Sequence, residues 1–169
     1  RGHIAYNEPP RSPWYRVSVD EFRNCTTRIL NLNEDTLIAL SHRIHACPEI
    51  AYQEVQASGW LADALRRQGF DVTPGIAGLP TAFRAVAGSG HPAVAILAEY
   101  DALPGIGHGC GHNIIATAAL GAGIGVRAVI DGLEGSVQVI GTPAEEVYGG
   151  KVAMVREGAF DGLDAAIMP

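Results

Sequence analysis

The stretch AVAILAEYDALPGIGHGCGHN, residues 93–113, decides the fold of this chain. Its first part, AVAILAE at 93–99, is an almost continuous apolar run, which is typical of a β-strand covered on both faces. A glycine-rich loop follows over 101–112, and a helix rich in small residues is predicted over 113–130. A strand, a loop and a helix in this order predict the repeating unit of an α/β domain.

Helices and buried strands alternate along the rest of the chain. Apolar residues recur at helical spacing from residue 34, so a helix is predicted there, and the proline at 48 ends it. Further helices are predicted at 54–68 and 147–157, and further strands at 70–73, 82–87, 136–140 and 163–168. We expect residues 1–33 to be irregular, and residues 34–169 to form an α/β domain with a mostly parallel or mixed sheet and helices on both faces.

The composition excludes several classes of protein. Hydrophobic residues make up 47% of the 169 residues and charged residues 18%, which predicts a buried core and excludes a disordered chain. The net charge of −6 argues against nucleic-acid and anionic-membrane partners, since both attract clustered Lys and Arg. No apolar run approaches the roughly 20 residues of a membrane span, and the opening residues lack the pattern of a signal peptide. Three cysteines are an odd and sparse set, so we expect reduced thiols and a cytoplasmic protein.

Nucleotide-binding motifs do not account for the glycine-rich segments. Neither GIGHGCG nor GAGIGV fits G-x-G-x-x-G, and the sequence contains no Walker A string. In open α/β sheets, chemistry collects at the carboxyl ends of the strands, where AEYDALPGIGHGCGHN and GTPAEE fall. The sequence therefore directs attention to these two loops.

His108, Cys110 and His112 alternate with two glycines immediately before a predicted helix. In an extended backbone, residues i, i+2 and i+4 share a face, so these three side chains can converge on one metal ion. The helix N-terminus behind them is expected to stabilise the Cys110 thiolate, the form that binds a metal. The alternative is a buried cysteine and a pair of surface histidines in a glycine-rich loop.

Glu145 and Glu146 directly follow the predicted strand at 136–140. Adjacent side chains point in different directions, so one carboxylate can bind a metal while the other acts as general base on a water molecule. The alternative is a solvated loop or a helix cap. Asp101, after the strand at 93–99, is either a turn residue or the acceptor that orients a ligating histidine.

The stretches AEYDALPGIGHGCGHN and GTPAEEVYGGK, together with HRIHACPEIAYQE, resemble the aminoacylase/carboxypeptidase family of co-catalytic metallo-amidohydrolases. The likeness is to the branch with a cysteine ligand, which includes p-aminobenzoyl-glutamate hydrolases, auxin-conjugate hydrolases and β-alanyl-lysine dipeptidases. It extends from about residue 34 to the end of the sequence. The resemblance implies a phosphorylase/hydrolase-like metallopeptidase catalytic domain.

By this resemblance, Cys110, His112 and Glu146 match metal ligands, Glu145 matches the general base, and Asp101 belongs to the catalytic strand-end motif. The implied cofactor is a divalent metal, with two ions per complete site, drawn from zinc, manganese, nickel and cobalt. The implied reaction is hydrolysis of an amide bond in a dipeptide or N-acyl amino acid by a metal-activated water. Full-length members of the family are expected to form homodimers.

The sequence departs from the family pattern after the strand at 163–168. Members carry a further ligand histidine in a Met-x-His-Pro-like string, whereas residues 166–169 read AIMP. The resemblance therefore implies the first part of a catalytic domain, without the lid and dimerisation domain and without the C-terminal part. His108 precedes the ligands and is expected to support them without binding the metal.

Two alternatives to an active amidohydrolase follow from these residues. A truncated chain of the same fold can be a catalytically inactive metal-binding or scaffold domain. A cysteine-dependent enzyme would use Cys110 as nucleophile and His112 as base, but residues two apart seldom form such a pair.

Overall fold

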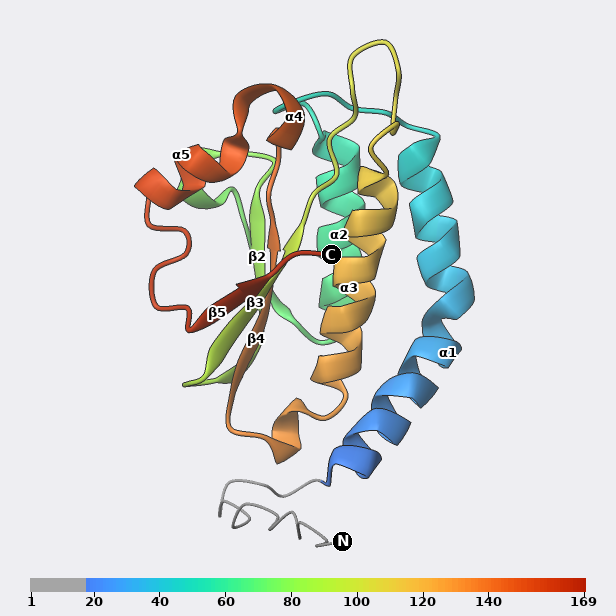
Figure 1. Ribbon diagram of the computed structural model, residues 1–169, viewed down its shortest axis with the longest axis vertical. Helices are drawn as coiled ribbons and strands as arrows, with labels where there is room; N and C mark the ends of the chain where they lie inside the picture. The colour runs from blue at the N-terminus through green and yellow to red at the C-terminus, as the bar shows by residue number, and fades with distance from the viewer. Residues whose placement is uncertain (1–17) are drawn as a thin grey trace, which may run out of the picture.

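The computed structural model describes residues 18–169 and forms a five-stranded sheet with helices on both faces (Figure 1). The strands are β1 (Asp71–Pro74), β2 (Phe83–Ser89), β3 (Ala93–Ala98), β4 (Gly135–Gly141) and β5 (Ala165–Ile167). The helices are α1 (Val19–His45), α2 (Val55–Arg67), α3 (His112–Arg127), α4 (Glu145–Tyr148) and α5 (Gly150–Arg156). Short 3-10 helices lie at η1 (Ile76–Gly78) and η2 (Ile130–Gly132).

The sheet is mixed, in the order β1-β2-β4-β3-β5. Strand β3 runs parallel to β4 and to β5, whereas β1 with β2 and β2 with β4 pair antiparallel. The prediction of a mixed α/β sheet is confirmed, while a mostly parallel sheet is wrong. The connection from β1 to β2 is too short for the helical crossover that parallel strands need, so these two strands form a hairpin-like pair.

Two apolar cores lie on the two faces of the sheet. Helices α1, α2 and α3 cover one face, where the larger core includes Leu61, Phe83 and Leu120. Helix α5 covers the other face, where Met154 packs with Leu97 and the partly buried Phe160. Strand β3 contributes side chains to both cores, which explains its continuous apolar run.

Helix α1 begins at Val19, so the expectation of an irregular segment up to residue 33 is wrong for the described part. Ser18 and Glu21 form a capping box, in which the Ser18 side chain accepts from the Glu21 amide and the Glu21 carboxylate accepts from the Ser18 amide. The expectation for residues 1–17 lies outside the described residues. The capping pair satisfies amide groups at the helix start, so the helix begins at Val19, and it runs 27 residues to His45.

Glycines in α3 let it approach both of its neighbours. A Cβ at Gly121 would lie 3.2 Å from Cδ1 of Leu37 in α1, and a Cβ at Gly123 would lie 2.5 Å from Cγ2 of Val139 in β4. The prediction that small residues bring this helix close to the sheet is therefore confirmed. The glycines on its other face serve the contact with α1.

The helix predicted at 147–157 is divided in two. Gly149 has a φ of +58°, which ends α4 after Tyr148, and α5 begins at Gly150. Helix α4 starts two residues earlier than predicted, so Glu145 and Glu146 form its first turn rather than the loop before it.

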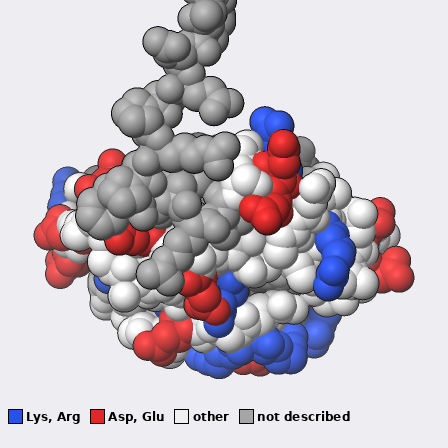
Figure 2. Space-filling model, turned by 90° about the horizontal axis from the view of Figure 1, so that it is seen from below, with Lys and Arg blue, Asp and Glu red and all other residues white. Residues whose placement is uncertain are grey.

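Charged groups of both signs are spread over the surface. Figure 2 shows the lower end of the molecule, where acidic side chains stand at several separate places and basic side chains gather along one rim. The carboxylates described below lie at the other end, beside α4. Within residues 18–169, none of the helices is both long and apolar enough to cross a membrane.

Candidate metal centre

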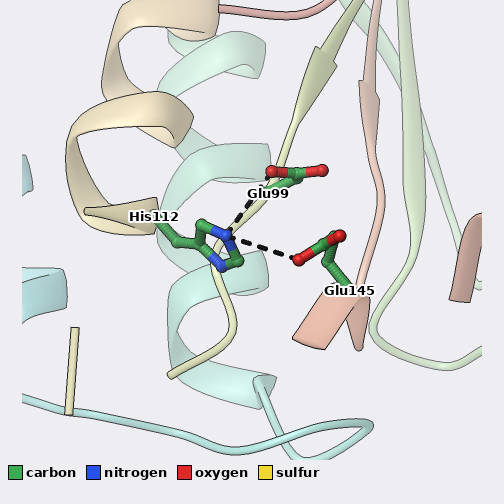
Figure 3. A group of neighbouring side chains, drawn as sticks. All are labelled: Glu99, His112 and Glu145. Carbon is green, nitrogen blue, oxygen red and sulfur yellow. Dashed lines mark ion pairs between the residues drawn. The ribbon is translucent and has the colours of Figure 1, made fainter. Parts of the chain in front are cut away.

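The candidate site lies where the carboxyl ends of β3 and β4 meet the first turn of α3. Because β3 and β4 are parallel, the residues that follow them come to the same edge of the sheet. Glu99 and Asp101 follow β3, the pair Glu145 and Glu146 begins α4 after β4, and His112 is the first residue of α3. Figure 3 shows the His112 ring facing Glu99 and Glu145.

Asp101 fixes the orientation of the His112 ring. Nδ1 of His112 lies 2.9 Å from the backbone oxygen of Asp101 and 3.0 Å from its Oδ1. The two oxygens next to Nδ1 accept a hydrogen bond, so in the neutral ring, the form that binds a metal, Nδ1 carries the proton and Nε2 keeps its lone pair. This is the arrangement in which a histidine binds a metal through Nε2. The prediction that Asp101 accepts from a candidate ligand histidine agrees with this geometry.

Three carboxylates surround the free Nε2 of His112. The nearest oxygens lie 3.5 Å away on Glu99, 3.7 Å away on Glu146 and 3.8 Å away on Glu145. The side chains of Glu99 and His112 are 5% exposed, whereas those of Glu146 and Glu145 are 21% and 40% exposed. The cluster therefore has a buried inner side and an open side formed by the acid pair.

Negative charge predominates around His112. Burial lowers the pKa of His112, but the hydrogen bond and charge of Asp101 and the charge of Glu99 outweigh it and raise the pKa above its usual value. Burial raises the pKa of Asp101, but the hydrogen bonds from His112 and from the Glu146 amide outweigh it and lower the pKa. Carboxylates held this close favour a cation among them, and imidazole with carboxylate oxygens is a donor set that suits a divalent metal.

Glu99 is the site residue that the sequence patterns did not reveal. One ligand atom each from Glu99, His112 and Glu145 lie within 4.8 Å of one another, which makes these three a group able to hold a metal ion. Glu99 also forms an ion pair with Lys151 of α5. Glu99 lies two residues before Asp101, directly after β3. Because alternate residues of an extended chain share a face, this spacing was the available signal in the sequence.

Glu145 and Glu146 converge instead of diverging. Their adjacent positions predict side chains that point in different directions, but both carboxylates face Nε2 of His112. The Glu146 amide also donates to Oδ2 of Asp101 at 3.0 Å. Since both residues belong to one helical turn anchored on Asp101, their carboxylates are presented together.

Cys110 lies in the loop before α3, exposed and beside Glu146. The hydrogen bond to Glu146 comes first among the causes that raise the pKa of this thiol, followed by slight burial and by the charges of Glu146 and Glu145. The expected stabilisation of the thiolate by the helix is therefore overturned by the nearby carboxylates. The same carboxylates disfavour Cys110 as a nucleophile, because the thiolate is the reactive form and they raise the pKa of the thiol.

His108 stands apart from the carboxylates. His108 lies in a bend, Gly109 and Cys110 form a turn, and His112 begins α3, so the extended geometry expected for His108, Cys110 and His112 is wrong. The glycines there, with a φ of +80° at Gly111, bend the chain. The His108 ring is buried 6.2 Å from the His45 ring, and neither of its nitrogens has a hydrogen-bond partner among residues 18–169. Burial lowers its pKa, and the nearby charges of His45 and His112 lower it further.

The chain is similar in sequence to known hydrolases, although no family model matches it. It is 42% identical over 139 residues to one subunit of the p-aminobenzoyl-glutamate hydrolase of Escherichia coli, covering 71% of this chain and 29% of that protein. It is also 42% identical over 153 residues to the Xaa-Arg dipeptidase of Mus musculus, covering 79% of this chain and 34% of that protein.

A solved structure supplies the family name. The fold matches that of the Bacillus subtilis YXEP protein, described as a dinuclear metal binding peptidase from the M20 family, with a TM-score of 0.69. That likeness, at 24% identity, covers 85% of this chain and 42% of the other. This chain belongs to the M20 amidohydrolase family. The resemblance stated from the sequence is thereby confirmed.

The M20 chain described here spans between 29% and 34% of the length of these curated relatives. A second solved structure, the aminobenzoyl-glutamate utilization protein from Klebsiella pneumoniae, matches the fold with a TM-score of 0.69 at 19% identity. It covers 83% of this chain and 44% of that one.

Proposed function

We propose that the protein carrying this chain is a metal-dependent amidohydrolase that cleaves the amide bond of a dipeptide or an N-acyl amino acid. The observation that carries the proposal is the His112 ring, which Asp101 holds through Nδ1 while Nε2 faces three carboxylates. The names of the relatives, an aminobenzoyl-glutamate hydrolase and an Xaa-Arg dipeptidase, support amide substrates with a free amino-acid end.

The donor set fits a divalent cation. We propose His112, Glu146 and Cys110 as ligands, following the family pattern, with Glu99 as a further carboxylate within reach. A bound divalent metal polarises the amide carbonyl and makes a water molecule more acidic. Zinc, manganese, nickel and cobalt all suit such ligands, and we propose two ions for a complete site.

Glu145 is proposed as the general base. Its carboxylate is 40% exposed, so it can reach a substrate, and it faces the same side of His112 as the other acids. In this role Glu145 takes a proton from the attacking water and gives it to the departing amine nitrogen, as general acid–base catalysis requires. Asp101 holds His112 in its orientation and anchors the Glu146 amide, which keeps the acid pair at the imidazole.

The remaining properties of the protein are proposed on the same basis. Residues 18–169 would contribute part of an M20 catalytic domain, because α1 is continuous across residue 34. Its partners would be small peptides or acyl amino acids rather than nucleic acids or membranes. The acidic net charge supports that choice. We further propose a cytoplasmic protein, from its three free cysteines, and a homodimer for the full-length protein, from its family.

Hydrolysis assays test the proposal. Purified protein loaded with Mn²⁺ is incubated with p-aminobenzoyl-glutamate, Xaa-Arg dipeptides and N-acetyl amino acids, and products are followed by mass spectrometry. We expect Glu145→Gln to lower kcat by about 10²–10⁴-fold, the usual contribution of a general base. Glu134→Gln, an exposed residue before the opposite end of β4, is the control. Hydrolysis that persists unchanged in Glu145→Gln would contradict the mechanism, and metal binding without hydrolysis would favour an inactive metal-binding domain.

A further inference from the structure

Glu54, immediately before α2, is a buried carboxylate that the proposed chemistry does not use. Its side chain is fully buried, with 0% of the residue exposed. Within residues 18–169, no Lys or Arg forms an ion pair with it. Burial raises the pKa of Glu54, although its hydrogen bonds act in the opposite direction. A carboxyl group held away from water without a cation is costly, so its position calls for a structural reason.

The Glu54 carboxylate accepts hydrogen bonds from three separate parts of the chain. Its Oε1 accepts from the backbone amides of Tyr52 at 3.0 Å and Ala144 at 2.9 Å. Its Oε2 accepts from the hydroxyl of Thr81 at 3.1 Å. Tyr52 and Ala144 have φ values of +61° and +58°, a conformation that L-residues other than glycine seldom adopt. One oxygen therefore stabilises two unfavourable backbone conformations.

Ala144 is the residue that leads into the acid pair. It comes directly before Glu145, and its left-handed conformation sets the direction in which α4 leaves the sheet. The Glu146 amide is held by Asp101. Two carboxylates thus hold the start of α4: Glu54 accepts from the Ala144 amide, and Asp101 accepts from the Glu146 amide.

A second contact joins the same two segments. The Tyr52 ring stacks on the Tyr148 ring at the end of α4, with centroids 5.4 Å apart and planes inclined by 15°. The turn before α2 therefore touches α4 at both ends, through Glu54 at its start and Tyr52 at its end. Both contacts come from a turn about 90 residues away in sequence.

We propose that Glu54 is a positioning residue for the acid pair: by accepting the Ala144 amide, it fixes the start of α4 and places Glu145 and Glu146 beside His112. The inference rests on the proposed function, in which these acids bind the metal and move the proton. Glu54 acts through backbone hydrogen bonds, so an uncharged acceptor of the same shape can replace it. Gln offers one oxygen for both amides, and the Thr81 hydroxyl can turn to accept from the Gln amide nitrogen.

The test compares Glu54→Ala and Glu54→Gln with a matched control, Glu49→Gln. The Glu49 carboxylate belongs to the same turn and accepts from the amides of Gln56 and Ala57, so it caps α2 without touching α4. Two quantities are measured on each folded protein, well below its unfolding temperature. One is the Kd for Mn²⁺ by calorimetry, and the other is the hydrogen-exchange rate of the Ala144 amide by NMR.

We expect Glu54→Ala to bind Mn²⁺ about tenfold more weakly or worse, as when outer contacts of a metal site are lost. The Ala144 amide should exchange about tenfold faster or more, because its hydrogen bond is lost. Glu54→Gln should restore both quantities to within about threefold of the wild type, a difference of less than 1 kcal/mol, and Glu49→Gln should leave both unchanged. Rescue by Gln supports hydrogen bonding as the cause, which a general loss of stability would not reproduce.

Three results would overturn the proposal. The first is a Glu54→Ala variant that binds Mn²⁺ as tightly as the wild type. The second is an equal loss of Mn²⁺ affinity in Glu54→Gln and Glu54→Ala. The third is an Ala144 amide that exchanges without protection in the wild-type protein. The last result needs no variant, so it decides the question even if Glu54→Ala does not fold. A wild-type protein that binds no Mn²⁺ would instead contradict the proposed function, and the Ala144 exchange rates would still decide whether Glu54 holds α4.

Discussion

Replacing Asp101 with Asn tests how the candidate site holds its histidine. The Asp101 carboxylate accepts from Nδ1–H of His112 at 3.0 Å and from the Glu146 amide at 3.0 Å, one on each oxygen. Asn keeps the shape but has a single oxygen, so its NH₂ group must face one of these two donors. A buried donor left without an acceptor costs about 1–3 kcal/mol, and each 1.4 kcal/mol is a factor of ten in affinity.

The expected result for Asp101→Asn is a Kd for Mn²⁺ raised about 10–100-fold, the range found when the partner of a metal-binding histidine is lost. The backbone oxygen of Asp101, 2.9 Å from Nδ1, still accepts from His112, which keeps the loss at the lower end of this range. The assay is isothermal titration of the folded protein with Mn²⁺, with circular dichroism to confirm the fold.

Asp164→Asn is the matched control. The Asp164 carboxylate also contacts a histidine nitrogen, Nδ1 of His91 at 2.6 Å, and accepts from the backbone amide of Ala93 at 2.7 Å. Asp164 directly precedes β5 and contacts the first residue of β3, at the opposite end of that strand from the candidate site. Its replacement should leave the Kd unchanged. Mn²⁺ binding by Asp101→Asn within about twofold of the wild type, less than 0.5 kcal/mol, would refute the reasoning, as would an equal loss in Asp164→Asn.

Two further predictions concern stability. Gly150→Ala should destabilise the fold by about 1–3 kcal/mol, because its Cβ would lie 1.9 Å from the backbone oxygen of Pro143. Gly59→Ala has open space around its Cβ and should stabilise α2 by about 0.5–1 kcal/mol. Urea unfolding measures both changes, and equal effects of the two substitutions would contradict the packing argument. Burial, then the charge of Glu54, raises the pKa of Tyr100 well above its usual value. The Tyr100 hydroxyl therefore keeps its proton to a higher pH in the folded state than in the unfolded state, so the free energy of unfolding should fall as pH rises above about 10. Tyr100→Phe should flatten that fall in urea titrations between pH 9 and about 11, and an unchanged slope would count against it.

The sequence was informative where physical rules act locally. The continuous apolar run at 93–99 predicted a strand buried on both faces, and β3 contributes to both cores. The strand-end rule predicted that residues after β3 and β4 would meet, because it follows from parallel pairing alone. Of the two alternatives for Asp101, a turn residue or an acceptor that orients a ligating histidine, the second agrees with its contact with His112.

Other features depended on long-range packing. The early start of α1 depends on the Ser18–Glu21 capping box and on packing against α3, neither of which the apolar spacing after residue 34 records. Glu99 was missed because its position two residues before Asp101 becomes informative only once its neighbours in the fold, His112 and Glu145, are known. The convergence of Glu145 and Glu146 required the left-handed turn at Ala144, which Glu54 holds from 90 residues away.

The most direct test of the central claim is a crystal structure of the Mn²⁺-loaded protein with anomalous data collected near the manganese edge. We predict an anomalous peak at a bonding distance of about 2.0–2.3 Å from Nε2 of His112, with carboxylate oxygens of the surrounding acids completing the ligands. A peak bonded to Nδ1, or a peak away from His112, would contradict the claim that Asp101 leaves Nε2 free for the metal.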